Sequence, residues 1–206
     1  MQRYILFADR LSEWFGRAFG WLVLMMTLGT SYEVFVRYFL RHPTSWAFDL
    51  SFITYGTMFM MAGAYALARN AHVRGDFIYR LWAPRTQARV ELFLYFIFFF
   101  PGILALIFAG WKYASRSWAQ LEVSINSPAG IPVFGLKTVI VAAGVLLFIQ
   151  GLAEVMRCII CIRTGEWPAR DTDVEEMDIT LIREVQQGHI PVVEAGQDPM
   201  PEEDRR

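Results

Sequence analysis

Four apolar segments constrain the fold more than any other feature of the sequence. They cover about residues 19–39, 48–68, 92–111 and 136–160 of the 206-residue chain. A helix needs about 20 mostly apolar residues to cross the roughly 30 Å of hydrocarbon in a bilayer, and each segment meets that requirement. Backbone polar groups in lipid must pair within their own structure, and the alternating pattern of a membrane barrel is missing. We therefore predict an all-α integral membrane protein with four transmembrane helices.

Composition supports this class and excludes others. The chain is 55% hydrophobic and only 19% charged, against roughly 25% charged residues in an average soluble domain. Residues 1–164 carry 15 basic and 8 acidic side chains, whereas residues 165–206 carry 4 basic and 12 acidic ones. Such an apolar body excludes an ordinary cytosolic enzyme and a disulfide-rich secreted module, and it argues against binding to nucleic acid.

The segments around the spans divide the chain into three parts. Residues 1–18 have apolar side chains at helical spacing, which predicts an amphipathic helix in the membrane interface, or else a cytoplasmic extension of the first span. Residues 19–162 form the predicted four-helix transmembrane domain. Residues 163–206 form a polar, acidic cytoplasmic tail that has too few apolar residues to fold alone and is predicted to be partly disordered.

Two local features refine the spans. Pro101 and Gly102 fall inside the third span, where proline removes a helical hydrogen bond and predicts a kink. Glu33 and Arg37 follow the first apolar run in place of a small-residue cleavage site, so we expect this span to be a retained anchor.

Basic residues predict the orientation in the membrane. Ten Arg and Lys residues lie in the N-terminal segment, the loop between spans two and three, and the end of span four, whereas five lie on the other side. Positive charge accumulates on the cytoplasmic side of membrane proteins. We therefore expect a multi-pass protein of the inner (plasma) membrane with both termini in the cytoplasm.

Several ionisable or polar residues lie in or near the spans. Glu33 and Arg37 are four residues apart and can pair on one helix. Gln150 and Glu154 share one face of the fourth span, and Asp49 and Lys137 stand near the outer ends of neighbouring spans. Such residues mark an ion path or tie helices together. We expect ties, because no chain of acidic residues runs through the middle of the membrane.

No cofactor or metal is predicted. Cys158 and Cys161 have the spacing of half a zinc site, but no second cysteine pair completes it. Two histidines often hold haem in small membrane subunits. His42 and His72 are separated by the whole second span, so they cannot bind one iron.

The order of motifs resembles a known family. Phe35, Arg37 and Tyr38 are followed by Trp46 and the acidic Asp49. The second span then ends at Arg69, before His72 and Asp76, and later matching residues include Lys137, Gln150 and Glu154. This pattern resembles the DctQ-like small permease subunit of tripartite ATP-independent periplasmic (TRAP) transporters, in which Asp49 would replace the more usual Glu.

The resemblance implies a non-enzymatic subunit that works with two partners. These are a large multi-span permease subunit and a periplasmic substrate-binding protein, with lipid around them, and together they carry out sodium-coupled uptake of an organic anion such as a carboxylate. Arg37, Tyr38, Trp46 and Asp49 would form an outer cluster. Arg69, His72 and Asp76 would form an inner one. With Glu33, Lys137, Gln150 and Glu154, these residues are the candidates for subunit contact or structural support.

Two other functions remain open from the sequence. One is a membrane-anchor subunit of a redox complex, and the other is a freestanding four-helix channel or carrier. A haem absorption band would identify the first, and ion flux through the chain alone would identify the second.

Overall fold

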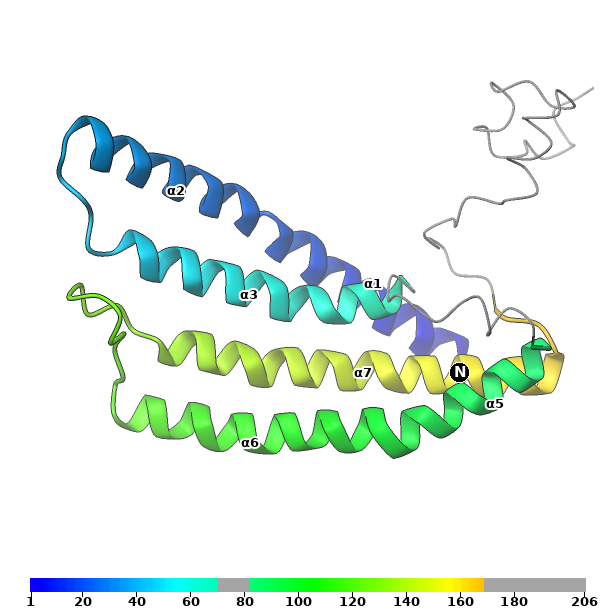
Figure 1. Ribbon diagram of the computed structural model, residues 1–206. Helices are drawn as coiled ribbons and strands as arrows, with labels where there is room; N and C mark the ends of the chain where they lie inside the picture. The colour runs from blue at the N-terminus through cyan, green and yellow to red at the C-terminus, as the bar shows by residue number, and fades with distance from the viewer. Residues whose placement is uncertain (70–81, 169–206) are drawn as a thin grey trace, which may run out of the picture. The chain divides into compact units, whose positions relative to one another are not determined.

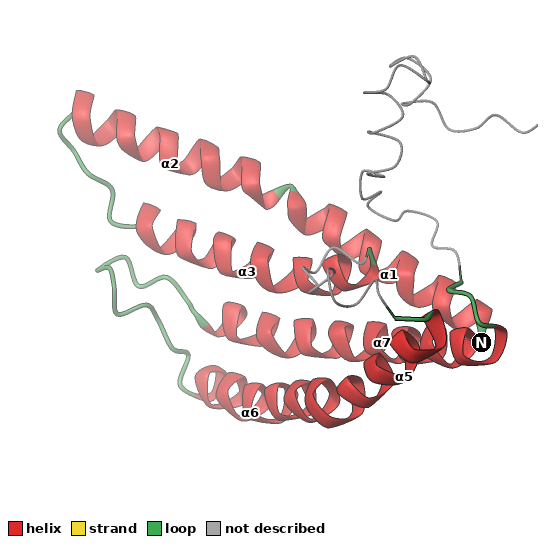
Figure 2. Ribbon diagram, turned by 45° about the vertical axis from the view of Figure 1, so that its right-hand side comes forward, coloured by secondary structure: helices red, strands yellow, loops and turns green. Residues whose placement is uncertain are grey.

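The computed structural model describes residues 1–69 and 82–168, which are almost entirely helical. Figures 1 and 2 show the helices α1 (Gln2–Gly20), α2 (Leu22–Phe39), α3 (Ala47–Ala68), α5 (Pro84–Leu94), α6 (Phe100–Ala119) and α7 (Phe134–Thr164). A π-helical turn, η1 (Tyr95–Phe99), joins α5 to α6. His72, Asp76 and most of the acidic tail lie outside the described residues.

Four helical stretches are long and apolar enough to cross a membrane. They are Gln2–Phe39, Ala47–Ala68, Pro84–Ala119 and Phe134–Thr164. Each contains one predicted span, and the first and third extend well beyond it. The predicted all-α fold with four membrane-spanning helices is therefore confirmed.

The long helices lie side by side in the order α2, α3, α7, α6 (Figures 1 and 2). The two inner members of this row, α3 and α7, pack against each other, while α2 packs on α3 and α6 packs on α7. The two inner helices of the row are more buried than the two outer ones. In the most apolar part of α7, 44% of the residues are buried within the chain. The corresponding share is 6% in the most apolar part of Pro84–Ala119, the stretch that contains α6. The helix α7 is therefore the centre of the packing.

The N-terminal helix α1 continues almost directly into α2, with only Trp21 between them. It crosses the C-terminal ends of α3 and α7, which we call the inner ends after the orientation predicted from the sequence, and the opposite ends are the outer ones. Ile5 and Ala8 pack there against Ala153. Phe7 and Trp14 remain exposed. These side chains, together with the exposed Leu6, are available to lipid in the predicted interfacial position.

The predicted kink corresponds to a π-helical turn just before Pro101. The N–H of Phe100 bonds to the carbonyl of Tyr95, five residues earlier, and the helix bends between α5 and α6 (Figure 1). Pro101 has no N–H to offer the carbonyl of Ile97, four residues earlier, and a wider turn accommodates that loss.

Gly16 allows α1 to lie against α3. A methyl group placed on Gly16 would come within 2.5 Å of both Cβ and Cγ of Tyr65. These atoms sit at the base of the tyrosine side chain and cannot move away without shifting α3 itself.

We predict that Gly16→Ala destabilises the chain, because the added methyl forces α1 away from Tyr65. Overpacking of this kind costs about 1–3 kcal/mol. Gly20→Ala is the matched control on the same helix, since a methyl group placed there would have nothing within 4 Å. Thermal unfolding in mild detergent would measure both variants, and equal behaviour of the two would contradict the assigned contact.

Candidate functional site

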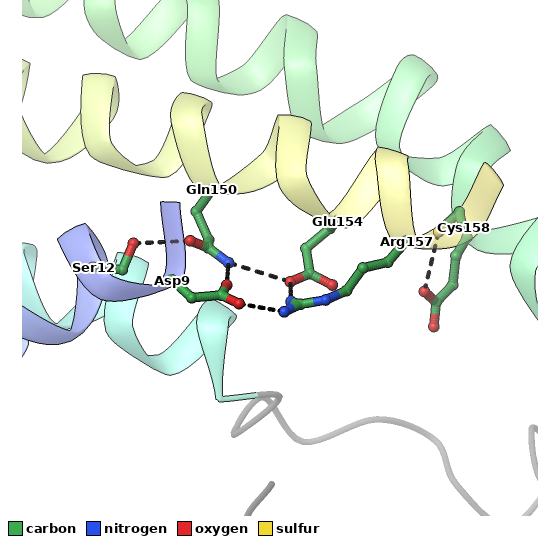
Figure 3. Close-up of polar contacts among 7 residues, drawn as sticks. Asp9, Ser12, Gln150, Glu154, Arg157 and Cys158 are labelled. Carbon is green, nitrogen blue, oxygen red and sulfur yellow. Dashed lines mark hydrogen bonds and ion pairs between the residues drawn. The ribbon is translucent and has the colours of Figure 1, made fainter. Parts of the chain in front are cut away.

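A buried polar network joins the inner ends of α1 and α7 (Figure 3). The hydroxyl of Ser12 donates to Oε1 of Gln150 over 2.9 Å, and Nε2 of Gln150 donates to Oδ1 of Asp9 over 2.9 Å and to Oε1 of Glu154 over 3.3 Å. Nη1 of Arg157 donates to Oε1 of Glu154 over 2.6 Å, and Nη2 donates to Oδ2 of Asp9. One guanidinium therefore links the carboxylates of two helices.

Burial makes this network important for packing. Gln150 and Glu154 are 0% and 1% exposed, and Arg157 is 2% exposed. Taking charges out of water is costly unless they are paired and hydrogen-bonded. The pairing of Glu154 and Asp9 with Arg157 meets that requirement and holds α1 against α7.

A second ion pair ties α1 to α3. Oε1 of Glu13 accepts from Nη2 of Arg69 over 3.0 Å and from Nη2 of Arg17 over 2.5 Å. The Arg69 guanidinium also lies over the Tyr65 ring, 4.9 Å from its centroid. Asp9 and Glu13 are one helical turn apart, so a single face of α1 contacts both neighbouring helices.

At the outer end, Glu33 closes the connection between α2 and α3. Its Oε1 accepts from Nη2 and Nε of Arg37 over 2.7 and 3.0 Å, as the spacing predicts. Its Oε2 accepts from the backbone N–H of Thr44 over 3.1 Å and from the Thr44 hydroxyl. This carboxylate therefore fixes the end of α2 relative to the turn that follows.

The four residues of the implied outer cluster are not brought together. Arg37 pairs with Glu33, Trp46 stacks on Tyr32 with ring centroids 6.1 Å apart, and Tyr38 is 74% exposed. Asp49 instead points to a different segment, residues 120–133, which we call the outer loop.

Asp49 anchors the outer loop. It is 1% exposed in the first turn of α3, where the helix dipole favours a negative charge. Its Oδ1 accepts from the Ser124 hydroxyl over 2.6 Å, and its Oδ2 accepts from the Ser127 hydroxyl. Since α3 and the outer loop are far apart in sequence, this carboxylate joins the two halves of the chain.

A lysine at the start of α7 holds the other side of the outer loop. Nζ of Lys137 pairs with Oε2 of Glu122 and lies 3.9 Å from the centroid of the Tyr113 ring. The hydrogen bond from Lys137 lowers the pKa of the Glu122 carboxyl below its usual value. An antiparallel bridge between Val123 and Pro132 also holds the two sides of the outer loop together.

The cysteines are packed into the helix interface. Cys158 and Cys161 are fully buried, and their thiols donate to Glu91 over 3.7 Å and to the Pro84 carbonyl over 3.5 Å. Within residues 1–69 and 82–168, no group of three His, Cys, Asp or Glu side chains is arranged to hold a metal ion.

Sequence reasoning missed several partners in these clusters. Asp9, Ser12 and Glu13 complete the inner ties, and Thr44, Ser124 and Ser127 complete the outer ones. The acids at 9 and 13 stand one turn apart in an otherwise basic N-terminal segment, and that spacing is the signal that could have found them. Serine and threonine are too common in loops to stand out in the same way.

The clusters occupy the two ends of the helices. The sequence has no Asp, Glu, Lys, Arg or His between residues 18 and 32, 50 and 68, 92 and 111, or 138 and 153. The arrangement can therefore tie helices together, but it offers no ladder of titratable groups across the membrane.

We predict that Arg157→Gln destabilises the chain by about 3–5 kcal/mol, because it leaves the buried Glu154 and the partly exposed Asp9 without their counter-ion. Asp9→Asn combined with Arg157→Gln should cost less than the sum of the two single changes. Arg163→Gln is the control, since Arg163 is exposed on the same helix. Unfolding by titration with a denaturing detergent would measure these effects, and additivity of the two changes would argue against the pair.

Comparison with known proteins places this arrangement in a family. No curated protein matched the chain. The family model described as "Tripartite ATP-independent periplasmic transporters, DctQ component" matches residues 26–160, which include the outer loop and most of α7. Since the match covers more than half of the chain, the protein belongs to the DctQ family and is a small membrane subunit of a tripartite ATP-independent periplasmic transporter.

Proposed function

We propose that the subunit scaffolds the large permease subunit and helps to dock the periplasmic substrate-binding protein during sodium-coupled uptake of an organic anion, such as a carboxylate. The solute would pass through the large subunit. The observation that carries this proposal is the single row of helices α2, α3, α7 and α6 with ionisable groups only at its ends. A row encloses no interior, so it is suited to lie against a larger protein.

The exposed sides of the row support contact with the permease subunit and with lipid. One side of α3 presents four large aromatic side chains at helical spacing, Phe48, Phe52, Tyr55 and Phe59, all more than half exposed. Such surfaces are stable only against another apolar partner. At the outer end, Tyr38 and Arg37 are exposed enough to contact the large subunit, whereas Asp49 is buried there and Gln150 is buried at the inner end, so both support the fold.

The outer loop supports a role in docking. Asp49 and Lys137 hold its two sides, and Ile125 at its tip is 96% exposed. A firmly anchored loop loses little conformational entropy when it binds, and an exposed apolar tip is a suitable contact for a protein partner. The predicted orientation in the inner membrane, with both termini cytoplasmic, puts this loop on the periplasmic side.

The two alternatives from the sequence have less support. A redox anchor would be a different family from the one that the chain matches. A freestanding carrier would need a path of its own, and the row of helices has no ionisable side chains along its middle. We therefore favour the scaffold.

Reconstitution into liposomes tests the scaffold directly. We expect the chain alone to transport nothing. Addition of the large subunit and the binding protein should give uptake of an organic anion that depends on a sodium gradient. A heat-inactivated binding protein is the control. Solute flux through the chain alone, or full uptake by the other two proteins without it, would contradict the proposal.

We predict that Ile125→Ser weakens docking of the binding protein by about 5–30-fold, the loss typical of a central apolar contact. The side chain is almost fully exposed, so the isolated chain should keep its stability. The apparent KM for the binding protein should rise while the maximal uptake rate stays the same. Ile125→Val is the matched control, and an unchanged KM in the serine variant would remove the loop from the docking surface.

A further inference from the structure

Two residues at the outer end adopt a backbone conformation that their side chains disfavour. Arg41 has a φ of 53° and Leu121 has a φ of 45°, and within residues 1–69 and 82–168 they are the non-glycine residues with positive φ. In this left-handed region Cβ crowds the backbone, so most side chains avoid it and glycine is the usual occupant. Such strain persists only where the surrounding structure requires it, and it often accompanies function.

Hydrogen bonds at the end of α6 require this conformation of Leu121. The N–H of Glu122 donates to the carbonyl of Ser117 over 3.1 Å, and the N–H of Leu121 donates to the carbonyl of Trp118 over 3.2 Å. Together these bonds close the helix end in the pattern that normally has glycine at the left-handed position. A leucine there satisfies the backbone less well than glycine would.

The end of α2 is closed in a similar way around Arg41. The N–H of His42 donates to the carbonyl of Val36 over 3.3 Å. At the inner end, the left-handed residue that ends α7 is a glycine, Gly165, with a φ of 91°. The chain therefore has glycine at this kind of position at the inner end and large side chains at the outer end.

Neither large side chain supports the fold through a buried contact. Leu121 is 67% exposed. Arg41 is also exposed, and it forms no ion pair with any residue of the described ranges. A side chain that strains the backbone and is not buried by the chain points to a contact outside the chain.

One partner can reach both residues. The turn after α2 and the outer loop lie at the same end of the helices (Figures 1 and 2). Arg41 follows α2 and Leu121 follows α6, at the two edges of the row, and the outer loop with its exposed Ile125 is tied to α3 by Asp49. Packed helices lie about 8–10 Å apart, so the edges are roughly 25–30 Å apart. A standard interface of about 800 Å² per partner has a similar width.

The exposed charges at the outer end are positive. Contacts within the chain hold all the acidic side chains of residues 33–49 and 112–137, which are Glu33, Asp49 and Glu122. The exposed basic side chains of the same segments are Arg37, Arg41, Lys112 and Arg116. Complementary charge steers association, so the fitting partner presents acidic side chains around an apolar patch.

We propose that Arg41 and Leu121 are docking contacts for the periplasmic substrate-binding protein. A carboxylate of that protein pairs with Arg41, and an apolar patch covers Leu121 and Ile125. This inference rests on the proposed function, because it assigns residues to the docking surface that the function requires. The hydrogen-bonded helix ends hold the backbone under both side chains, so little backbone entropy is lost on docking.

Glycine at either position separates docking from stability. Arg41→Gly and Leu121→Gly remove the side chain and the strain together, so the Tm of the chain in mild detergent should not fall. In liposomes that also contain the large subunit, the apparent KM for the binding protein should rise about 5–30-fold for Leu121→Gly. For Arg41→Gly it should rise about 2–5-fold, the value of one exposed ion pair. A lower Tm in both variants, or an unchanged KM in both, would overturn the proposal.

Conservative variants and salt identify the chemistry of the two contacts. Leu121→Met and Arg41→Lys keep the apolar or charged character and should keep most of the docking. The effect of Arg41→Gly should disappear in about 1 M potassium chloride, where the Debye length falls to about 3 Å, whereas the effect of Leu121→Gly should persist. An effect at position 41 that is independent of salt would contradict the acidic partner.

The same liposomes distinguish failure of this inference from failure of the proposed function. If uptake with the unmodified chain does not depend on the binding protein, the proposed function and the docking contacts both fail. If uptake does depend on it, and both glycine variants keep the unmodified KM, only the docking contacts fail. Loss of co-purification with the large subunit in the glycine variants would assign the two side chains to that subunit and would also overturn the proposal.

Discussion

An ionised side chain cannot remain unpaired where water is excluded, and this constraint organises the inner half of the molecule. Glu154 and Arg157 are buried on the central helix α7 and pair with each other, but the second terminal nitrogen of the Arg157 guanidinium needs a partner that α7 does not supply. Asp9 of α1 completes the set, and Glu13 pairs with Arg69 of α3 one turn further along. The position of α1 across two helices follows from these contacts and from the close approach at Gly16.

The outer half obeys the same constraint with different groups. Asp49 accepts hydroxyl hydrogen bonds from the outer loop, and Glu33 accepts from Arg37 and Thr44. These ties leave the middle of the row without charged side chains. The subunit therefore presents lipid and protein partners with a surface of hydrophobic side chains, while its charges stay at the two levels where water is close.

Much of the fold followed from length and hydropathy, because each span needs about 20 apolar residues and the sequence has four such runs. The pair of Glu33 and Arg37 and the shared face of Gln150 and Glu154 could also be predicted, since spacing along one helix determines both. Contacts between distant segments could not. Periodicity does not show that Asp49 reaches Ser124, or that α2 and α6 lie at opposite edges of a row, because neither depends on local spacing.

The sequence separation of the ion pairs bears on how the chain is assembled. Helices α2 and α3 are consecutive in the sequence and pack against each other, and so are α6 and α7. Asp9, however, is 148 residues from Arg157, so its partner emerges from the ribosome only after the last span is almost complete. The N-terminal helix is synthesised first and can pair with α3 through Glu13 and Arg69 early, but its contact with α7 can close only at the end, which makes the pair of Asp9 and Arg157 a marker of a fully inserted subunit.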